Sequence, residues 1–440
     1  MAVITGEVKT ILKEEGLKYH IGEIVKICGA VYKIRRMSDF AFVVLRTGRS
    51  LIQCIYSSEY AEFDLENIKE NYCVEIKGEV SEDSRSKLGF EIRIKEVTIL
   101  SKPEEDMPVV INNKKLAASL ETILNYRPIT LRNEKERAVF KIQEGICAAA
   151  REFLMGQAFT EIRSPKIVYA GAEGGANIFK LDYFGREAYL AQSPQFYKQM
   201  MVGVYDRVYE IGAVYRAEKH DTSRHLNEYT SIDLEMGYIK DFKEIMEMET
   251  KLLQEIIAYL QRNYNNELNL LEVVLPKVEG IPCVTFAEAK EMIHKAYQRE
   301  IRDYEDFEPE EERLLCELIK KQYHSEFVFV THYPTSKRPF YAMEDKENHK
   351  YTLSFDLLFR GLEITTGGQR IHDYAEQVDK LLKRQMNPEL FESYLMIHKY
   401  GMPPHGGLGM GLERLTMCLL GKGNVRETTL FPRDINRLEP

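Results

Sequence analysis

The sequence predicts an α+β protein of two domains, in which a small β-barrel precedes a larger domain of strands and helices. Short apolar strands follow one another between residues 20 and 100, whereas long amphipathic helices begin only after residue 135. The length of 440 residues suits two or three domains at about 150 residues each. We therefore expect a barrel domain over 1–105, a hinge over 106–135 and a second domain over 136–440.

The first domain is predicted to be a Greek-key barrel such as an OB-fold. Its strands are the apolar-rich segments VKICGAVYKIRRM, FAFVVLR, LIQCIY, YCVEIKGEV and EIRIKEVTIL. Five short strands within about 80 residues are typical of such a barrel. The next stretch mixes proline, asparagine and charge, which favours a hinge.

In the second domain, helices are predicted over 136–155 and 242–263. The latter carries apolar residues at helical spacing, which we interpret as core packing: Leu252, Leu253, Ile256, Ile257 and Leu260. Residues 264–330 are mixed in character and contain no chemical motif. We expect them to form a small insertion.

The composition excludes several classes of protein. Hydrophobic residues make up 44% and charged residues 29%, which excludes a largely disordered chain. No apolar run approaches the roughly 20 residues of a membrane span, and MAVITGEVKT does not resemble a secretory signal. The net charge of −9 excludes an overall basic surface for nucleic acid. Scattered cysteines without a C-x-x-C pair indicate thiols in a reducing cytoplasm rather than zinc or disulfides.

One barrel segment combines cations with aromatic residues. Between positions 33 and 49 these are Lys33, Arg35, Arg36, Phe40, Phe42, Arg46 and Arg49. Cations beside exposed rings suit the phosphates and bases of a single-stranded nucleic acid. The alternative is a solvated strand with Phe42 in the barrel core.

Residues 208–239 predict two strands with one polar, charge-mixed face. Alternation places Glu210, Arg216 and Glu218 on one face of the first strand. In the second strand, Tyr229, Ser231, Asp233 and Glu235 share one face and Ile232, Leu234 and Met236 the other. A cationic loop, KHDTSRHLN, joins them. This arrangement suits a nucleotide triphosphate, because arginine binds phosphate with two hydrogen bonds. The alternative is an ion-paired hairpin that faces solvent.

Three further segments carry candidate chemistry. Asp356 and Glu363 interrupt apolar strands that turn at Arg360-Gly361, which favours either Mg²⁺ ligands or a buried pair with Arg360 or Arg370. The glycine-rich segment 406–411 leads into a helix with Arg414, and no strand is expected immediately before it. Its glycines are expected to let another group approach the backbone closely, with simple tight packing as the alternative. The glycine-rich loop that contains Glu173 is predicted to be a lid, with an ordinary loop as the alternative.

Motifs in this order resemble the class II aminoacyl-tRNA synthetases. FTEIRSPKIV resembles motif 1, VYEIGAVYRAEKHDTSRHLNEYTSIDLEM motif 2 and HGGLGMGLERL motif 3. QSPQFYKQ, FDLLFRGLEI, GGQRIHDY and YGMPPHGG are most similar to aspartyl-tRNA synthetases of the archaeal and eukaryotic type. The resemblance covers nearly the whole chain. It implies an OB-fold that binds the anticodon and a catalytic domain on an antiparallel sheet flanked by helices.

The resemblance also implies site residues. The expected catalytic residues are Arg216, Glu363 and Arg414. The expected ATP-binding residues are Arg216, Glu218, Arg224, His225, Leu226, Tyr229, Glu363, Gly411 and Arg414. The expected aspartate-binding residues are Glu173, Ser193, Gln195, Lys198, Arg216, Asp233, Thr366 and Arg370. Magnesium is expected on Asp356, Glu363 and Thr366, and the tRNA anticodon on Arg36, Phe42 and Gln53. Independently of the resemblance, two cations such as Lys198 and Arg370 suit the distal carboxylate of aspartate, because each can form charge-assisted hydrogen bonds with it.

The implied reaction is the ATP-dependent ligation of L-aspartate to tRNA(Asp) by a cytoplasmic homodimer with Mg²⁺. Two alternatives are a sister enzyme for asparagine, against which Lys198 argues, and a non-enzymatic RNA-binding relative, against which Arg216, Glu363 and Arg414 argue. Relatives usually have Gly-Trp-Val at the start of the anticodon strand, where this chain has Gly29-Ala30-Val31. We therefore hypothesise that tRNA(Asn) is aspartylated as well.

Overall fold

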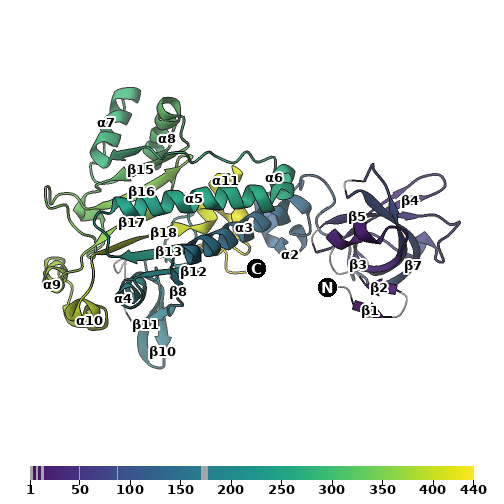
Figure 1. Cartoon of the computed structure of the whole chain (residues 1–440), viewed down its shortest axis with the longest axis horizontal. Helices are drawn as coiled ribbons and strands as arrows, with labels where there is room; N and C mark the ends of the chain where they lie inside the picture. The colour runs from purple at the N-terminus through teal and green to yellow at the C-terminus, as the bar shows by residue number, and fades with distance from the viewer. Residues whose placement is uncertain (1–2, 6–7, 11–13, 49, 87, 170–176) are drawn as a thin grey trace. The chain divides into compact units, whose positions relative to one another are not determined.

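The chain folds into two compact units, Met1–Ala117 and Ala118–Pro440. The computed structural model describes residues 3–5, 8–10, 14–48, 50–86, 88–169 and 177–440 (Figure 1). The boundary lies within the stretch predicted as a hinge. Residues after it form two helices of the second unit, α1 (Leu120–Asn125) and α2 (Arg127–Thr130). The buried guanidinium of Arg127 donates a hydrogen bond to the carbonyl of Thr429 at 2.9 Å. The hinge therefore remains a prediction for residues 106–117, whereas 118–135 are packed into the second unit.

The first unit is a closed barrel of the five predicted strands. These are β3 (Ile24–Arg36), β4 (Ala41–Arg46), β5 (Leu51–Tyr56), β6 (Cys73–Glu82) and β7 (Phe90–Ser101). They pair in the order β3-β4-β5-β7-β6, and β6 returns to pair with β3. Two further short strands, β1 (Val3–Thr5) and β2 (Val8–Thr10), precede them and were not predicted. Alternate residues of β4 (Ala41, Val43 and Leu45) point into the barrel core.

The second unit is built on an eight-stranded sheet in the order β14-β15-β16-β17-β18-β13-β12-β8. Its strands are β8 (Thr160–Glu161), β12 (Arg207–Tyr215), β13 (Glu228–Gly237), β14 (Cys283–Thr285), β15 (Phe327–Thr331), β16 (Ser354–Phe359), β17 (Leu362–Arg370) and β18 (His405–Gly411). The edge pairs β14–β15 and β12–β8 are parallel, and the strands between pair antiparallel. The predicted fold class is confirmed.

The glycine-rich segment is itself a central strand, which was not predicted; it follows α10 (Glu392–Tyr400), so no strand immediately precedes it. In β18, Gly407, Gly409 and Gly411 alternate with Leu408 and Met410. The two apolar side chains enter the hydrophobic core, and the glycines therefore occupy the opposite face of the sheet. A strand without side chains on that face leaves the surface of the sheet bare.

Three helices pack against the apolar face of the sheet (Figure 1). They are α3 (Glu134–Gly156), α5 (Lys243–Asn263) and α11 (Leu412–Leu420). The predicted helices at 136–155 and 242–263 are confirmed. The α3 helix begins at Asn133, whose side chain accepts hydrogen bonds from the backbone amides of Lys135 and Glu136.

Residues 264–330, expected to be an insertion, form part of the architecture of this unit. They contain α6 (Asn265–Leu271), α7 (Phe286–Tyr297) and α8 (Pro309–Tyr323). They also contribute β14 and β15 to the main sheet. Helices α7 and α8 pack on β15 in a separate core that includes Ile293, Leu315 and Val328.

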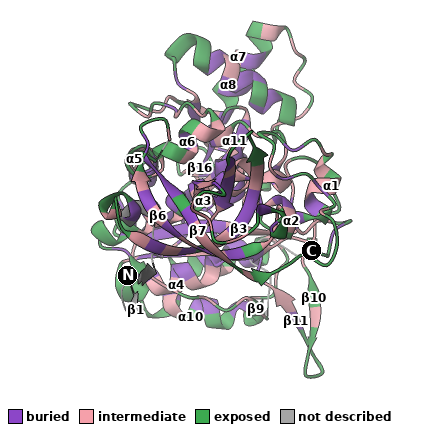
Figure 2. Cartoon of the chain, turned by 90° about the vertical axis from the view of Figure 1, so that its right-hand side faces the viewer, coloured by how far each residue is buried: buried purple, intermediate pink, exposed green. Residues whose placement is uncertain are grey.

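The remaining elements surround one end of the sheet. The predicted turn between β16 and β17 is confirmed, and Arg360 and Gly361 both have positive φ, 51° and 88°, as a two-residue hairpin with a type I′ turn requires. Helices α4 (Gln195–Tyr205), α9 (Tyr374–Lys383) and α10 (Glu392–Tyr400) lie nearby. A small sheet of β9 (Ile167–Val168), β10 (Lys180–Tyr183) and β11 (Arg186–Leu190) ends in an exposed hairpin (Figure 2).

Within the described part of the chain, no helix combines the length and the apolar character that a membrane span needs.

One acid, Glu249, is fully buried on the inner face of α5. Among the described residues, neither of its carboxylate oxygens has a hydrogen-bond partner. Burial raises the pKa of Glu249 to about 8, although the nearby hydroxyl of Thr365 opposes part of the rise. Because an uncompensated buried carboxylate is costly, this side chain is protonated at neutral pH.

We expect Glu249→Met to remove a pH dependence of stability. The folded protein keeps a proton on Glu249 between the ordinary pKa of 4.5 and about 8, whereas the unfolded chain has lost it. The free energy of unfolding of the wild type therefore falls across this window as pH rises, by a few kcal/mol relative to the variant. Urea unfolding at pH 5, 6.5 and 8 measures the difference. Glu247→Gln, an exposed change on the same helix, is the control, and parallel curves for wild type and Glu249→Met would contradict the assignment.

Candidate active site

A cavity of about 570 Å³ lies over the bare face of the sheet in the second unit. Five segments that are far apart in sequence contribute most of its lining: the start of α4, the β12–β13 hairpin, the loop 333–342, β16–β17 and the junction of β18 with α11. It is lined by all the described residues predicted to bind ATP, aspartate or metal: Ser193, Gln195, Lys198, Arg216, Glu218, Arg224, His225, Leu226, Tyr229, Asp233, Asp356, Glu363, Thr366, Arg370, Gly411 and Arg414. The remaining predicted residue, Glu173, and its loop lie outside the described residues.

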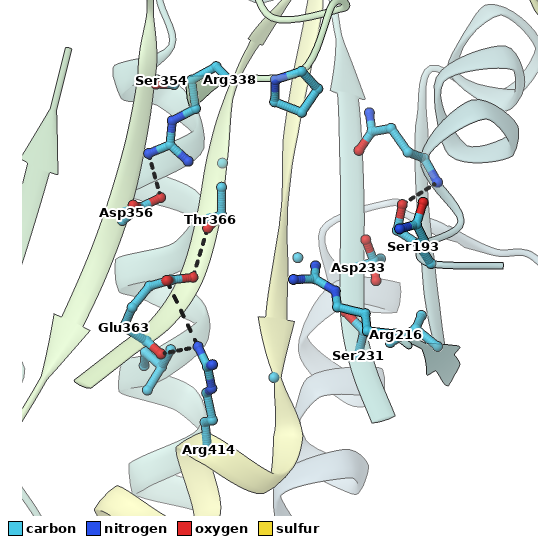
Figure 3. A pocket seen from close by; sticks show the side chains of 18 of the residues that line it. Ser193, Arg216, Ser231, Asp233, Arg338, Ser354, Asp356, Glu363, Thr366 and Arg414 are labelled. Atoms are coloured by element: carbon cyan, nitrogen blue, oxygen red, sulfur yellow. Dashed lines mark hydrogen bonds and ion pairs between the residues drawn. The ribbon is translucent and has the colours of Figure 1, made fainter. Parts of the chain in front are cut away.

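Strand β13 positions its polar side chains as the alternation predicts. Tyr229, Ser231 and Asp233 line the cavity, whereas Ile232 and Leu234 belong to the core beneath. The register places glycines of β18 directly opposite these polar residues, with Ser231 against Gly411 and Asp233 against Gly409. The floor between β13 and β17 is therefore open to a ligand (Figure 3).

The prediction for β12 was partly wrong. The strand ends at Tyr215, so Arg216 and Glu218 lie in the following loop and not on a strand face with Glu210. Glu210 is buried elsewhere, and it accepts a hydrogen bond from Nζ of Lys166 at 2.8 Å. The loop is held by its own last residue, since Nδ2 of Asn227, just before β13, donates to the carbonyls of Arg216 at 2.7 Å and Glu218 at 2.9 Å.

A buried cluster of four charges closes one end of the cavity. Nζ of Lys198 lies 2.7 Å from Oδ1 of Asp233 and 3.5 Å from Oε2 of Glu235. Nε of Arg370 donates to Oε1 of Glu235 at 3.0 Å. The expectation that Lys198 meets only the substrate therefore needs correction, because Asp233 and Glu235 already hold it. Glu235 was placed on this face by the alternation but given no role.

The cluster depends on a glycine. Glu235 faces Gly407 in the neighbouring strand, and a side chain on Gly407 would collide with this carboxylate and with the carbonyl of Leu234. The guanidinium of Arg370 also donates to the carbonyl of Gly407 at 2.9 Å. The groups that closely approach Gly407 are therefore side chains of the protein itself, Glu235 and Arg370.

The two acids of β16 and β17 lie on the other side of β18 (Figure 3). Asp356 forms an ion pair of 2.8 Å with Arg338, so an acid–arginine pair is present, but not with Arg360 or Arg370. Arg338 was not predicted, because it stands alone in a loop without any pattern. The hydroxyl of Thr366 donates to Glu363 at 2.9 Å, and Thr366 pairs with Asp356 across the strands.

Electrostatics distinguish these two acids. Burial raises the pKa of Asp356 to about 6, although Arg338 opposes the rise. Desolvation would also raise the pKa of Glu363, but Arg414 and the hydroxyl of Thr366 outweigh it and hold the pKa below its usual value. The guanidinium of Arg414 lies 3.9 Å from the Glu363 carboxylate and donates to its backbone carbonyl at 3.0 Å. Glu363 is thus an ionised oxygen donor at neutral pH.

The loop between β12 and β13 brings further charge to the cavity. Arg224 pairs with Glu312 of α8, a contact that was not predicted because it comes from the expected insertion. Nε2 of His225 lies 3.7 Å from Glu218, and burial lowers the pKa of His225. The Arg216 guanidinium lies 5.7 Å from the ring of Tyr229. Cations and a flat ring at one end of an open floor suit a phosphorylated nucleotide.

The barrel surface is a separate candidate site on the first unit. Phe42 is half-buried, lies outside the barrel core and packs edge-on against Phe40 at 5.2 Å between ring centroids; the alternative that placed it in the core was wrong. Arg35 lies opposite Phe42 and Gln53 opposite Val44, on the same outer face. Arg36 is not brought to this face, since it pairs with Glu66 at 2.8 Å.

Comparison with known proteins agrees with this arrangement. Residues 119–435 match the family tRNA synthetases class II (D, K and N), and residues 25–100 match the OB-fold nucleic acid binding domain. An aspartate–tRNA(Asp/Asn) ligase of Deinococcus radiodurans is 45% identical over 99% of this chain and 100% of its own length. An aspartate–tRNA(Asp) ligase of Picrophilus torridus is 42% identical over 94% of this chain and 97% of its own.

A solved structure supports the same relationship. Asparaginyl-tRNA synthetase from Pyrococcus horikoshii, complexed with asparaginyl-adenylate, superimposes with a TM-score of 0.89 at 28% identity and covers 96% of this chain and 97% of its own. The barrel, the largely antiparallel sheet and the cavity lined by residues of motifs 2 and 3 conform to this family. The chain belongs to the class II tRNA synthetases.

Proposed function

We propose that this protein is an aspartate–tRNA ligase. The observation that carries the proposal is the closed end of the cavity, where Lys198 and Arg370 are both buried and both line the space. Two cations at the distal end suit a carboxylate better than a neutral amide, since they provide charge-assisted hydrogen bonds that an amide oxygen uses poorly. The proposal is further supported by the names of the relatives from Deinococcus and Picrophilus.

In this proposal, aspartate and ATP lie along the bare floor and meet at Arg216. Arg216 binds the α-phosphate and the α-carboxylate, Tyr229 and Arg414 enclose the adenine, and Glu218 and His225 contact the adenine and the γ-phosphate. Ser193, Gln195 and Asp233 surround the ammonium group. An oxygen of the α-carboxylate attacks the α-phosphorus, the bond to the bridging oxygen breaks, and pyrophosphate leaves. A ribose hydroxyl of the terminal tRNA adenosine then attacks the acyl carbon, and AMP leaves.

No protein nucleophile takes part in these steps. Catalysis comes from alignment of the two substrates and from neutralisation of charge on the phosphates by Arg216 and Arg414. Such groups act strongly here because they are fixed in a partly desolvated cavity before the reaction begins.

The donor set beside Arg414 fits magnesium. Glu363, Thr366 and Asp356 present hard oxygen donors, although no group of three His, Cys, Asp or Glu side chains able to hold a metal exists among the described residues. Mg²⁺ commonly binds one or two carboxylates and completes its coordination with waters and substrate phosphates. We propose that Glu363 and Thr366 hold it, supported by Asp356, and that it neutralises charge on the triphosphate.

The assembly and location of the protein are also proposed. Exposed apolar side chains gather in and beside motif 1, with Met155, Ile167 and Tyr169 each about half exposed or more, which suits a homodimer interface. All seven cysteines lie in the described residues as free thiols, which suits the cytoplasm. The outer face of Phe42 and Gln53 is proposed to bind the anticodon.

Aspartate-dependent pyrophosphate exchange, measured beside asparagine, tests the substrate. The wild type should exchange with aspartate and not with asparagine. Lys198→Met should raise the aspartate KM some hundreds-fold or more, because loss of one partner of a buried charge pair costs about 3–5 kcal/mol. Since the change leaves two carboxylates, Asp233 and Glu235, with Arg370 as the one cation of the cluster, the double variant Lys198→Met/Glu235→Gln restores neutrality and should show the same aspartate KM with better stability. Exchange within a few-fold of wild type in both variants would contradict the assignment.

The nucleotide end of the cavity can be tested separately. Arg414→Ala should raise the KM for ATP and lower the adenylation rate about 100-fold, as expected for a group that stabilises developing charge. The KM for aspartate should stay within a few-fold. Arg437→Ala, at a buried arginine outside the cavity, is the control. If excess aspartate restored the adenylation rate of Arg414→Ala while excess ATP and Mg²⁺ did not, the assignment of Arg414 to the nucleotide end of the cavity would be wrong.

We further propose that both tRNA(Asp) and tRNA(Asn) are aspartylated. Their anticodons differ in the last letter, and contacts to one base edge are worth only about 1–3 kcal/mol. Ala30 and Tyr32, near the first strands, are buried, and the Tyr32 hydroxyl donates to the carbonyl of Ile111 at 2.9 Å. Neither offers a bulky outer surface to that letter.

Aspartylation of the two transcripts in one buffer decides this point. We expect kcat/KM values within about tenfold of each other, and Phe42→Ala should weaken both equally because the middle base is shared. A preference above about a hundredfold for the C-ending anticodon, the limit of such contacts, would establish a protein specific for tRNA(Asp).

A further inference from the structure

A chain of buried hydrogen bonds leads from the first residue of β18 to the amino-acid end of the cavity. His405, Gln199 and Gln195 are each almost fully buried. Nε2 of Gln199 lies 2.9 Å from Nε2 of His405. Oε1 of Gln199 lies 2.9 Å from Nε2 of Gln195, which lines the cavity. Of the three, only Gln195 has been given a role so far.

The chemistry of His405 fixes the direction of these bonds. Its Nδ1 lies 2.9 Å from the carbonyl oxygen of Pro403. A carbonyl oxygen can only accept, so Nδ1 carries the hydrogen. Burial lowers the pKa of His405 to about 3, and the ring is therefore neutral. Its Nε2 is then an acceptor, and the NH₂ group of Gln199 must face it.

The orientation of the Gln199 amide in turn fixes the orientation of the Gln195 amide. Because the NH₂ group of Gln199 faces His405, its carbonyl oxygen must face Gln195, and it also accepts from the hydroxyl of Tyr394 at 3.3 Å. That oxygen can only accept, so the NH₂ group of Gln195 is turned inward. The carbonyl oxygen of Gln195 is the end of the amide that remains for the cavity.

We propose that His405 and Gln199 are positioning residues that hold the carbonyl oxygen of Gln195 toward the ammonium group of the amino acid. The inference rests on the proposed function of the cavity and goes beyond it by naming what orients Gln195. If the amide of Gln195 were free to turn, its NH₂ group would face the ammonium group of the substrate in part of the molecules. This orientation would weaken the binding of aspartate but not of an analogue that lacks the ammonium group.

The test compares aspartate with succinate, which lacks the ammonium group. Pyrophosphate exchange gives the KM for aspartate and for ATP, and competition gives the Ki of succinate. Gln199→Met should raise the aspartate KM about 10- to 100-fold, the range for a hydrogen bond to a charged group. The Ki of succinate and the KM for ATP should change less than about threefold. Gln199→Glu keeps an acceptor oxygen toward Gln195 and should retain most of the preference for aspartate.

A second route leaves α4 unchanged. His405→Met removes the acceptor at the far end and should shift the aspartate KM in the same direction without moving the succinate Ki, even if Gln199→Met fails to fold. His398→Met is the control, because His398 is also buried and bonds to Tyr394 but not to Gln199. Equal changes for aspartate and succinate, or no change for either, would overturn the inference. A wild type that does not activate aspartate would instead overturn the proposed function.

Discussion

The burial of four charged side chains at the centre of the sheet constrains much of the surrounding structure. The carboxyl groups of Asp233 and Glu235 on β13 are buried away from water, and Lys198 and Arg370 reach them from α4 and β17 as partners of opposite charge. Two positive and two negative charges form a neutral set. Room for them exists only where β18 carries no side chain, at Gly407. The positions of three strands and one helix are thus coupled through one cluster.

The same arrangement divides the cavity into two regions with different electrostatics. On the β13 side, charges are paired and buried, and this is the end of the cavity proposed to bind aspartate. On the β16–β17 side, Glu363 stays ionised beside Arg414 while Asp356 is held by Arg338. The glycines of β18 lie between the two regions. They let one ligand approach another along the sheet without a side chain between them.

Local patterns in the sequence predicted the features that depend on local structure. The two-residue period of β13 identified its cavity face, the helical stripe identified the core side of α5, and Arg360-Gly361 identified a tight turn. The same period runs through Gly407 to Gly411, with Leu408 and Met410 as the apolar partners, and it would have revealed β18 had the glycines been read as strand positions. Strand ends are less visible, which is why Glu210 was grouped with Arg216.

Contacts between distant segments could not be read in this way. Arg338 comes from a loop without periodicity, and the helical pattern around Glu312 does not indicate a partner; Asp356 and Arg224, with which they pair, lie on other elements. Nothing local marks either residue as part of the cavity. The position of Arg35 opposite Phe42 could not be read from the sequence for a related reason, because only the pairing register of β3 with β4 decides which arginine lies there.

The depth of the four-charge cluster separates two kinds of recognition by their response to ionic strength. The side chains of Lys198 and Asp233 are only 2% and 4% exposed, so mobile ions, which screen solvent-exposed charges over about 8–10 Å, cannot enter between them. The cations on the outer face of the barrel stand in water. Added salt should therefore weaken the binding of a nucleic acid backbone while the affinity for the amino acid stays almost constant. As the electrolyte concentration rises, transfer to tRNA should be lost before formation of the adenylate.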